Sequence, residues 1–276
     1  MIHLSAFADE ISPDLSEQIA VLRGEGIRFL DLRAVWGTNV LDLTDQQVAE
    51  IKQSLDAHGI GVAAIGSPIG KVPIDDSLDD QLRRLERAIM LAQVYGTPFI
   101  RIFSFYPATS NPAPVSAYRD EVIPRLRVLT ERARQADITL LHENDTGLYG
   151  DTIARCVDVM QSVDDAHLRA VFDPANFIQS QQAPFPDGYE ALRPWLRYVH
   201  VKDALRDGTV VPAGEGEGRW PDFLSRLRDD RYDGFFSLEP HLAAAGQFQG
   251  FSGPDLFRRA SQALQQMLRT MAWEYA

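Results

Sequence analysis

The sequence predicts an α/β protein of the (β/α)8 barrel class, folded as a single domain over residues 1–276. Short apolar runs rich in β-branched and aromatic residues recur along the chain, and amphipathic helical segments lie between them. The runs are about 30 to 40 residues apart, which suits one strand and one helix per unit. Strict alternation favours a parallel sheet, and eight units with no leftover strand favour closure into a barrel. The length of 276 residues agrees with this class.

Each predicted strand is a short apolar run that ends near a polar or turn-forming residue. The eight runs are IHLSAF, FLDLRA, GVAAIG, FIRIFSF, TLLHEN, RAVFD, YVHVKD and GFFSLE, which begin near residues 2, 29, 61, 99, 139, 169, 198 and 234. Between them, the segments 14–26, 44–59 and 77–96 each open on Asp, Thr or Ser and close at Gly. These are start and stop signals of helices.

Two segments after predicted strands are expected to be long loops at the mouth of the barrel. Residues 106–116 are rich in proline and follow the fourth strand, and residues 243–255 follow the eighth. The glycine-rich segment 214–218 resembles a phosphate-binding loop only weakly, because its two Glu side chains lie beside the backbone amides and oppose an anion. It is expected to be a turn that leads into a helix over 220–228.

Composition narrows the range of partners. The net charge of −12 opposes binding to nucleic acid, which needs clustered Lys and Arg. No run of 18 apolar residues and no export signal is visible, so we expect neither membrane insertion nor export. The one cysteine, Cys156, is expected to be a buried thiol, in keeping with a cytoplasmic protein. Barrels of this class often pair, so a homo-oligomer is compatible with the sequence.

Four predicted strands end in a side chain that can bind a metal ion. They are Glu143, Asp173, His200 and Glu239, on the fifth to eighth strands. The carboxyl ends of the strands converge on one mouth in a parallel barrel, so these groups are expected to surround one divalent cation. Side chains alternate across a strand, which places Glu143 inward, its neighbour His142 outward, and Lys202 on the same side as His200.

The donor set indicates which cation is expected. Three carboxylates and one imidazole, without a thiolate, suit Mn²⁺ first, with Mg²⁺, Co²⁺ or Zn²⁺ as alternatives. A lone carboxylate at a strand end more often caps a helix, but four ligand types on adjacent strands favour a metal site. The remaining coordination positions suit a small carbohydrate or polyol-derived substrate with neighbouring carbonyl and hydroxyl oxygens. No nucleotide cofactor is expected.

Six short motifs are informative: SAFADEIS at 5–12, HEN at 142–144, FDPAN at 172–176, HVKD at 200–203, GEGEGRWPDF at 214–223 and SLEPH at 237–241. Together they resemble the xylose isomerase-like TIM-barrel superfamily of sugar phosphate isomerases and epimerases. The resemblance covers nearly the whole chain and implies a TIM barrel with one divalent metal. The superfamily includes sugar epimerases and isomerases, dehydratases, C-glycoside deglycosidases and endonuclease IV, so its fold does not select the reaction.

The resemblance also implies roles for individual residues. Glu143 and Glu239 match metal ligands that double as acid and base, and Arg206 matches a substrate-contacting arginine of the epimerases. Asn176 stands where those epimerases carry His. The favoured function is a metal-dependent isomerase or epimerase that moves a proton next to a carbonyl through a metal-stabilised ene-diolate.

Three other functions are alternatives to this one. The first alternative is a lyase, either a dehydratase or a C-glycoside deglycosidase, in which the same enolate expels a leaving group. A minor alternative is a non-catalytic sugar-binding barrel. A nuclease like endonuclease IV would need a histidine-rich cluster of three metals, and few of the six histidines are expected at the mouth.

Further pocket residues are expected at the other strand ends. The substrate-binding candidates, besides Asn176 and Arg206, are Glu10, Arg33, Trp36, Ser67, Arg101 and Lys202. Lys202 is the strongest of them, because its inward position beyond His200 places an ammonium group near the metal, where it can hold a substrate oxygen. The others can equally form a rim salt bridge or anchor a loop. Trp36, together with Phe103 and Phe177, is a candidate apolar wall for a sugar face.

Overall fold

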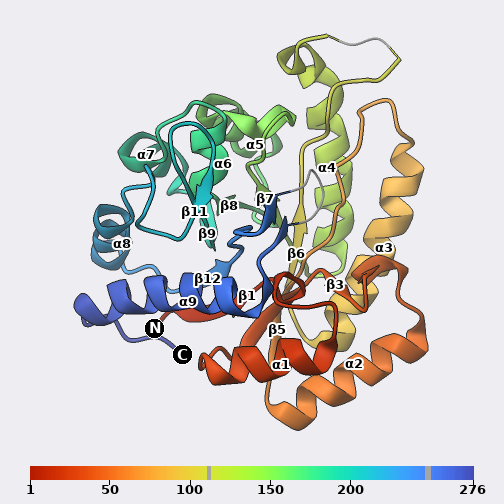
Figure 1. Cartoon of the computed structure of the whole chain (residues 1–276). Helices are drawn as coiled ribbons and strands as arrows, with labels where there is room; N and C mark the ends of the chain where they lie inside the picture. Colours follow the sequence, from red (N-terminus) through yellow and green to blue (C-terminus); the bar gives the residue numbers. More distant parts are fainter. Residues whose placement is uncertain (111–112, 246–249) are drawn as a thin grey trace.

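Eight parallel strands form a barrel with helices around it, which confirms the predicted fold class (Figure 1). The computed structural model describes residues 1–110, 113–245 and 250–276. The barrel strands, in chain order, are β1 (His3–Ala6), β2 (Phe29–Leu32), β5 (Gly61–Ile65), β6 (Phe99–Ile102), β7 (Thr139–Glu143), β8 (Leu168–Phe172), β9 (Leu196–Val201) and β12 (Phe235–Leu238). All eight coincide with the apolar runs in the sequence.

The strands are paired in the order β1, β12, β9, β8, β7, β6, β5, β2. The circle closes between β1 and β2 through side chains. Ser5 Oγ donates a hydrogen bond of 2.8 Å to Asp31 Oδ2, and the rings of His3 and Phe29 lie 5.5 Å apart. The carboxyl ends of all eight strands therefore share one end of the barrel.

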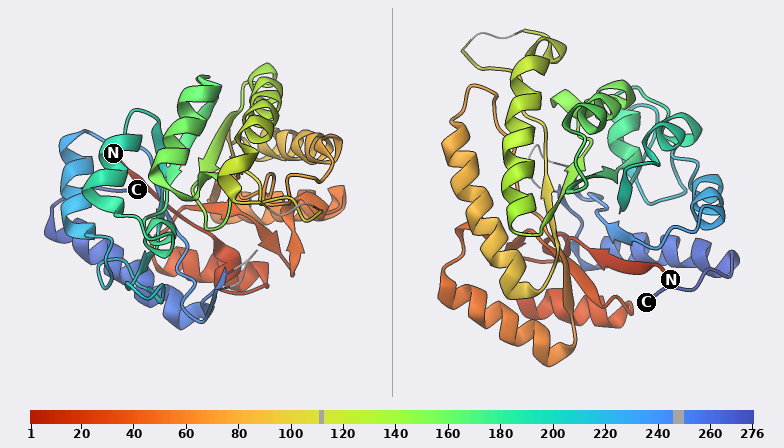
Figure 2. Two further views of the ribbon diagram at one scale, coloured as in Figure 1. Left: turned by 90° about the horizontal axis from the view of Figure 1, so that it is seen from above. Right: turned by 180° about the vertical axis from the view of Figure 1, so that it is seen from behind.

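Helices cover the outside of the barrel, as Figure 2 shows from two further directions. The longer ones are α1 (Leu15–Gly24), α2 (Asp45–His58), α3 (Leu78–Tyr95), α4 (Arg119–Gln135), α5 (Ile153–Val163), α8 (Trp220–Asp229) and α9 (Gly253–Thr270). The predicted caps are present: Thr44 and Gln47 form a capping box before α2, and Gly59 ends that helix with φ 67°. Cys156 is a buried free thiol within α5.

Short elements are inserted in the loops. They are η1 (Ala8–Glu10), β3 (Ala34–Val35), β4 (Thr38–Asn39), η2 (Val40–Asp42), η3 (Val115–Tyr118), η4 (Tyr149–Asp151), α6 (Pro174–Gln179), η5 (Pro184–Gly188), α7 (Tyr189–Leu192), β10 (Asp203–Ala204), β11 (Val210–Val211), β13 (Ala244–Ala245) and β14 (Gly250–Phe251). The segment predicted as a long loop over 243–255 thus contains the antiparallel pair β13 and β14 and the start of α9. Residues 246–249 of that loop, and 111–112 of the loop over 106–116, lie outside the described residues.

The barrel interior is filled below the mouth. Its lower part is aromatic: the ring of Phe235 lies 5.3 Å from Phe29 and is stacked at 5.4 Å on Tyr198. Alanines of β5, together with Leu141 and Val171, complete this inner cluster. Close packing of this kind supports a rigid floor beneath the strand ends.

The two termini lie side by side at the far end of the barrel (Figure 1). Leu4 N donates to Ala276 O at 2.9 Å, and Ala276 N donates to Ile2 O at 3.1 Å. Among the described helices, none combines the length and the apolar character that crossing a membrane requires.

Candidate metal centre at the barrel mouth

The four predicted metal ligands meet at the carboxyl ends of β7, β8, β9 and β12. His200 Nδ1 lies 3.4 Å from Glu143 Oε1, 3.4 Å from Glu239 Oε2 and 3.9 Å from Asp173 Oδ2. All four side chains are buried. We call these four residues the quartet. They meet because each is the last inward side chain of its strand, and barrel closure brings the carboxyl ends of these strands together.

The quartet suits a divalent cation. One ligand atom from each residue lies within 4.8 Å of the others. Ligands about 2.0–2.4 Å from one ion are separated by about 3–4 Å, which matches the distances from His200 Nδ1. That nitrogen is buried and has no hydrogen-bond partner among the described residues. A buried polar atom aimed at three carboxylates is typical of a ligand.

Local structure explains how Asp173 reaches the quartet. Its Oδ1 accepts a hydrogen bond from Asn176 N at 3.0 Å and so caps α6, while its Oδ2 faces the other ligands. Asn144 locks this corner, because it donates to Asp173 O at 2.9 Å and accepts from Asp173 N at 3.0 Å. The HEN and FDPAN motifs therefore clamp the ends of two neighbouring strands together.

Cationic side chains surround the quartet. Lys202 Nζ lies 2.8 Å from Asp173 Oδ2 and 3.2 Å from Glu239 Oε2. Arg101 Nη1 bridges Glu143 Oε2 at 3.1 Å and Glu239 Oε1 at 3.5 Å. The two contacts of Lys202 place its side chain inward, on the same side as His200, where strand alternation puts it. These ion pairs hold the carboxylates close together despite their mutual repulsion.

Arg33 pairs with carboxylates of the site. Its Nε lies 2.8 Å from Asp9 Oδ2, its Nη1 lies 2.9 Å from Glu239 Oε1, and its Nη2 lies 3.6 Å from Glu10 Oε1. Its guanidinium also stacks 4.6 Å from the ring centroid of Phe7. The ion-pair alternative for Arg33 is therefore realised in this structure.

Two further substrate-binding candidates contact neighbours of the quartet. Glu10 Oε2 accepts from His241 N at 2.8 Å and from Ser252 Oγ at 3.1 Å, which anchors the loop after β12. Ser67 Oγ donates to Arg101 O at 2.5 Å and holds the strand that carries Arg101. Asn176 is at the quartet itself, since its Nδ2 lies 3.3 Å from Glu143 Oε1.

The last two candidates lie on exposed loops. Trp36 is 36% exposed on the turn between β3 and β4. Arg206 is exposed between β10 and β11 and lines a hollow with Gln181, Phe185 and Arg219, outside the quartet. Phe103 and Phe177 are fully buried, so they contribute packing in this structure.

Two buried acids of the site were not predicted from the sequence. Asp9 pairs with Arg33, and Asp31 accepts hydrogen bonds inside the barrel from Ser5 Oγ at 2.8 Å, from Tyr198 OH at 2.7 Å and from Ser237 Oγ. Alternation along FLDLRA puts Asp31 on the inward face with Arg33, so that signal was available. No comparable pattern in the sequence pointed to Asp9.

His142 lies on the other face of β7, against Gly150 of η4. A Cβ added at Gly150 would approach His142 Cε1 to 2.5 Å. Burial lowers the pKa of His142 to about 4, so its imidazole is neutral at physiological pH. This agrees with the structural role expected from strand alternation.

Electrostatics distinguish the ligands from one another. Burial lowers the pKa of His200, but the carboxylates of Glu143 and Glu239 outweigh burial and raise it to about 10. Burial raises the pKa of Asp173 to about 6, against the opposing effect of Lys202. The pKa of Glu143 falls to about 2, because His200 and Arg101 outweigh its burial. Without a metal ion, the protonated imidazole of His200 therefore carries a positive charge among the three carboxylates.

This arrangement predicts that metal affinity rises with pH. The pKa of His200 lies above its ordinary value of 6.5, so the imidazolium form predominates at neutral pH in the metal-free protein. A cation binds the neutral imidazole and must release that proton, so affinity is expected to rise about tenfold per pH unit between about pH 7 and 9. Titration calorimetry with Mn²⁺, in buffers of different ionisation enthalpy, counts the released protons. Affinity that is flat across this range would contradict the assignment of His200.

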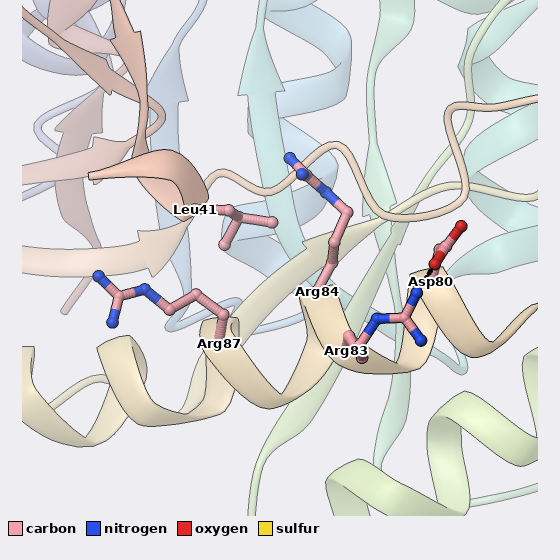
Figure 3. Close-up of a pocket in the computed structure, with 5 residues that line it drawn as sticks. All are labelled: Leu41, Asp80, Arg83, Arg84 and Arg87. Atoms are coloured by element: carbon pink, nitrogen blue, oxygen red, sulfur yellow. Dashed lines mark ion pairs between the residues drawn. The ribbon is translucent and has the colours of Figure 1, made fainter. Parts of the chain in front are cut away.

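A different hollow lies on the outer face of α3 and is distinct from the quartet. Leu41, Asp80, Arg83, Arg84 and Arg87 line it (Figure 3). Its arginines are paired with nearby carboxylates: Arg83 with Asp80, Arg84 with Asp42 and Arg87 with Asp45. These pairs satisfy the arginines at the surface, so the hollow has the character of a solvated helix face.

Comparisons with known proteins bear on the family and the fold of this chain. The family described as "Xylose isomerase-like TIM barrel" matches residues 19–267. A 3-dehydroshikimate dehydratase of Bacillus anthracis is 22% identical over 227 residues, which cover 74% of this chain and 79% of the relative.

Two solved structures illustrate the likeness of fold. A xylose isomerase-like barrel protein of Mycobacterium smegmatis in complex with magnesium has a TM-score of 0.74 at 19% identity, covering 99% of this chain and 97% of its own. A D-tagatose 3-epimerase-like protein has a TM-score of 0.77 at 15% identity, covering 99% and 98%.

Proposed function

This chain belongs to the xylose isomerase-like TIM-barrel family, and from that premise we propose that it is a divalent-metal-dependent isomerase or epimerase of a small carbohydrate or polyol-derived substrate. One observation carries the proposal. Glu143 and Glu239 both lie 3.4 Å from His200 Nδ1, and the guanidinium of Arg101 bridges them. Two carboxylates around one cation site are a suitable pair for moving a carbon-bound proton next to a carbonyl.

The quartet would hold the cation, with Mn²⁺ as the first choice and Mg²⁺, Co²⁺ or Zn²⁺ as alternatives. When bound, the cation supplies Lewis-acid stabilisation of negative charge on substrate oxygens. The Mycobacterium smegmatis protein of similar fold was solved in complex with magnesium, which supports Mg²⁺ as one of these alternatives.

The surrounding residues supply the rest of the chemistry. One glutamate of the pair removes the proton next to the carbonyl, and the other returns a proton to the neighbouring carbon or to the opposite face. Lys202 is available to steady an oxyanion, because its ammonium lies at the edge of the quartet and is buried. Asn176 donates to Glu143 Oε1 at 3.3 Å and orients that carboxylate.

The second candidate is a lyase, favoured by the dehydratase among the relatives. It shares the first step, in which a glutamate removes the proton next to the carbonyl. The enolate then expels a hydroxyl group from the β carbon; this group leaves as water after taking up a proton, and a C=C bond forms. The substrate, and not the first proton transfer, separates the two candidates.

A metal-reconstituted screen tests the proposal. The metal-free protein is loaded in turn with Mn²⁺, Mg²⁺, Co²⁺ and Zn²⁺ and is offered keto-sugars, inososes, 3-keto-glycosides and dehydroshikimate in deuterated water. Exchange replaces the proton next to the carbonyl by deuterium, so the proton NMR signal of that C–H group is expected to disappear. When a chelator removes the metal, the signal is expected to persist. Elimination products would favour the lyase. Saturable sugar binding without exchange or turnover would overturn both candidates in favour of a sugar-binding barrel.

A further inference from the structure

A buried carboxylate occupies the centre of the glycine-rich loop that follows β9. Asp203 accepts hydrogen bonds from four backbone N–H groups. Their donors are Ala204 N at 2.9 Å, Gly214 N at 3.0 Å, Gly216 N at 3.0 Å and Gly218 N at 2.9 Å. Convergent amides of this kind form an anion-binding nest. The GEGEG segment is therefore a turn, as expected, and it encloses a carboxylate of its own chain.

The glycines of this loop are required by close approach. A Cβ added at Gly216 would lie 2.5 Å from Asp203 Oδ1 and 2.4 Å from Ala204 O. A Cβ at Gly218 would lie 2.8 Å from Asp203 Oδ1, and Gly214 has φ +92°. Side chains at these positions would push the amides away from the carboxylate. The loop is thus shaped around Asp203.

The loop folds back onto the end of β9. Asp203 pairs with Val211 across the antiparallel strands β10 and β11, and Glu217 N donates to Ala204 O at 2.8 Å. The backbone at 203–204 is therefore held from several directions. Lys202 directly precedes it and faces the opposite side, with Nζ 2.8 Å from Asp173 Oδ2 and 3.2 Å from Glu239 Oε2.

We infer that Asp203 is a positioning residue, which holds Lys202 between Asp173 and Glu239 by closing the glycine-rich loop around its own carboxylate. Removing the carboxylate leaves the buried N–H groups of Ala204 and Gly218 without an acceptor, and the loop must rearrange to satisfy them. Lys202 then loses the fixed backbone from which it reaches the two ligands. The inference rests on the proposed function only for the part that Lys202 plays in the reaction.

A double-mutant cycle tests whether Asp203 acts through Lys202. Lys202→Met is expected to raise Mn²⁺ affinity by about tenfold or more, because it removes a positive charge beside two ligands. Asp203→Ala is expected to raise the affinity by a smaller factor, and to have no further effect when Lys202 is already replaced. Asp207→Ala is the matched control: Asp207 is exposed between β10 and β11 and accepts a hydrogen bond of 2.9 Å from Thr209 N, two residues along the chain.

Chemical rescue adds a second measurement. The nest left by Asp203→Ala is expected to bind formate saturably and acetate more weakly, since Gly216 and Gly218 leave little room around the carboxylate. Formate should return Mn²⁺ affinity to the wild-type value in Asp203→Ala, and should leave it unchanged in the double variant. If Asp203→Ala is poorly soluble, Asp203→Asn serves in the same cycle, because its amide keeps one acceptor oxygen.

The outcomes separate this inference from the proposed function. Equal effects of Asp203→Ala in both backgrounds, or an equal effect of formate in both, would overturn the positioning role. The same cycle is measured by urea unfolding of the metal-free protein, where non-additive changes are again expected. Wild-type protein that binds no Mn²⁺ would sink the proposed function, while the unfolding cycle would still decide the role of Asp203.

Discussion

Replacing Glu143 or Glu239 with Gln is expected to lower turnover by roughly 10²- to 10⁴-fold, which is the usual contribution of a positioned acid or base. Glutamine keeps an oxygen that can bind a cation but has no proton-accepting carboxylate. Each glutamate lies 3.4 Å from His200 Nδ1, and glutamine has nearly the same size and shape, so each variant is expected to fold and to retain the rest of the quartet. Turnover is measured at saturating Mn²⁺ on the substrate that the NMR screen identifies.

Two controls make this experiment decisive. Mn²⁺ affinity is determined for each variant separately, so that lost metal is not mistaken for lost proton transfer. Glu215→Gln is the matched substitution, because Glu215 is partly exposed and pairs with Arg259 away from the quartet. Near-normal turnover by both active-site variants would remove the acid and base assignment. If one variant still exchanges deuterium without net conversion, the glutamate that this variant retains is the one that removes the proton.

Replacing Arg33 with Met is expected to destabilise the protein by about 3–5 kcal/mol, since removal of one partner strands buried charges. Three carboxylates depend on this guanidinium: those of Asp9, Glu10 and Glu239, at 2.8 Å, 3.6 Å and 2.9 Å. All of these side chains are at most 5% exposed, so solvent screens them little. The free energy of unfolding is measured by urea denaturation of the metal-free protein.

Arg83→Met is the matched control for this substitution. Arg83 pairs with Asp80 on α3, where its side chain is 71% exposed, so the change is expected to be within about 0.5 kcal/mol. Mn²⁺ is expected to restore part of the stability of the Arg33 variant, because a bound cation compensates the charge of Glu239. If the two arginine variants unfold at the same urea concentration, the ion pairs of Arg33 do not stabilise the fold.

Much of the barrel could be predicted because its signals are local. Short apolar runs located every barrel strand, and Thr44 and Gly59 marked the ends of α2 where the structure has them. The quartet was predictable for a related reason. Parallel strands of a closed barrel bring their carboxyl ends to one place, so the identity of the last inward residue on each strand suffices.

The partners of those residues were less predictable, since they depend on side chains that are distant in sequence. Arg33 and Glu239 are 206 positions apart, and nothing in DLRAVWG or SLEPH indicates that one binds the other. Glu10 was a pocket candidate on its strand-end position, yet its carboxylate holds His241 and Ser252. In each case, the choice among several nearby charges was made by packing geometry.

The sequence by itself determined the order of strands and helices, the barrel, and the four residues that meet at its mouth, because periodicity and strand polarity are properties of short segments. Only the tertiary structure decided which basic side chains pair with the quartet. It also decided that Asp31 is hydrogen-bonded inside the barrel and that Asp203 lies at the centre of the glycine-rich loop. Those contacts form between segments that barrel closure brings together, where burial leaves each charge dependent on the partner within reach.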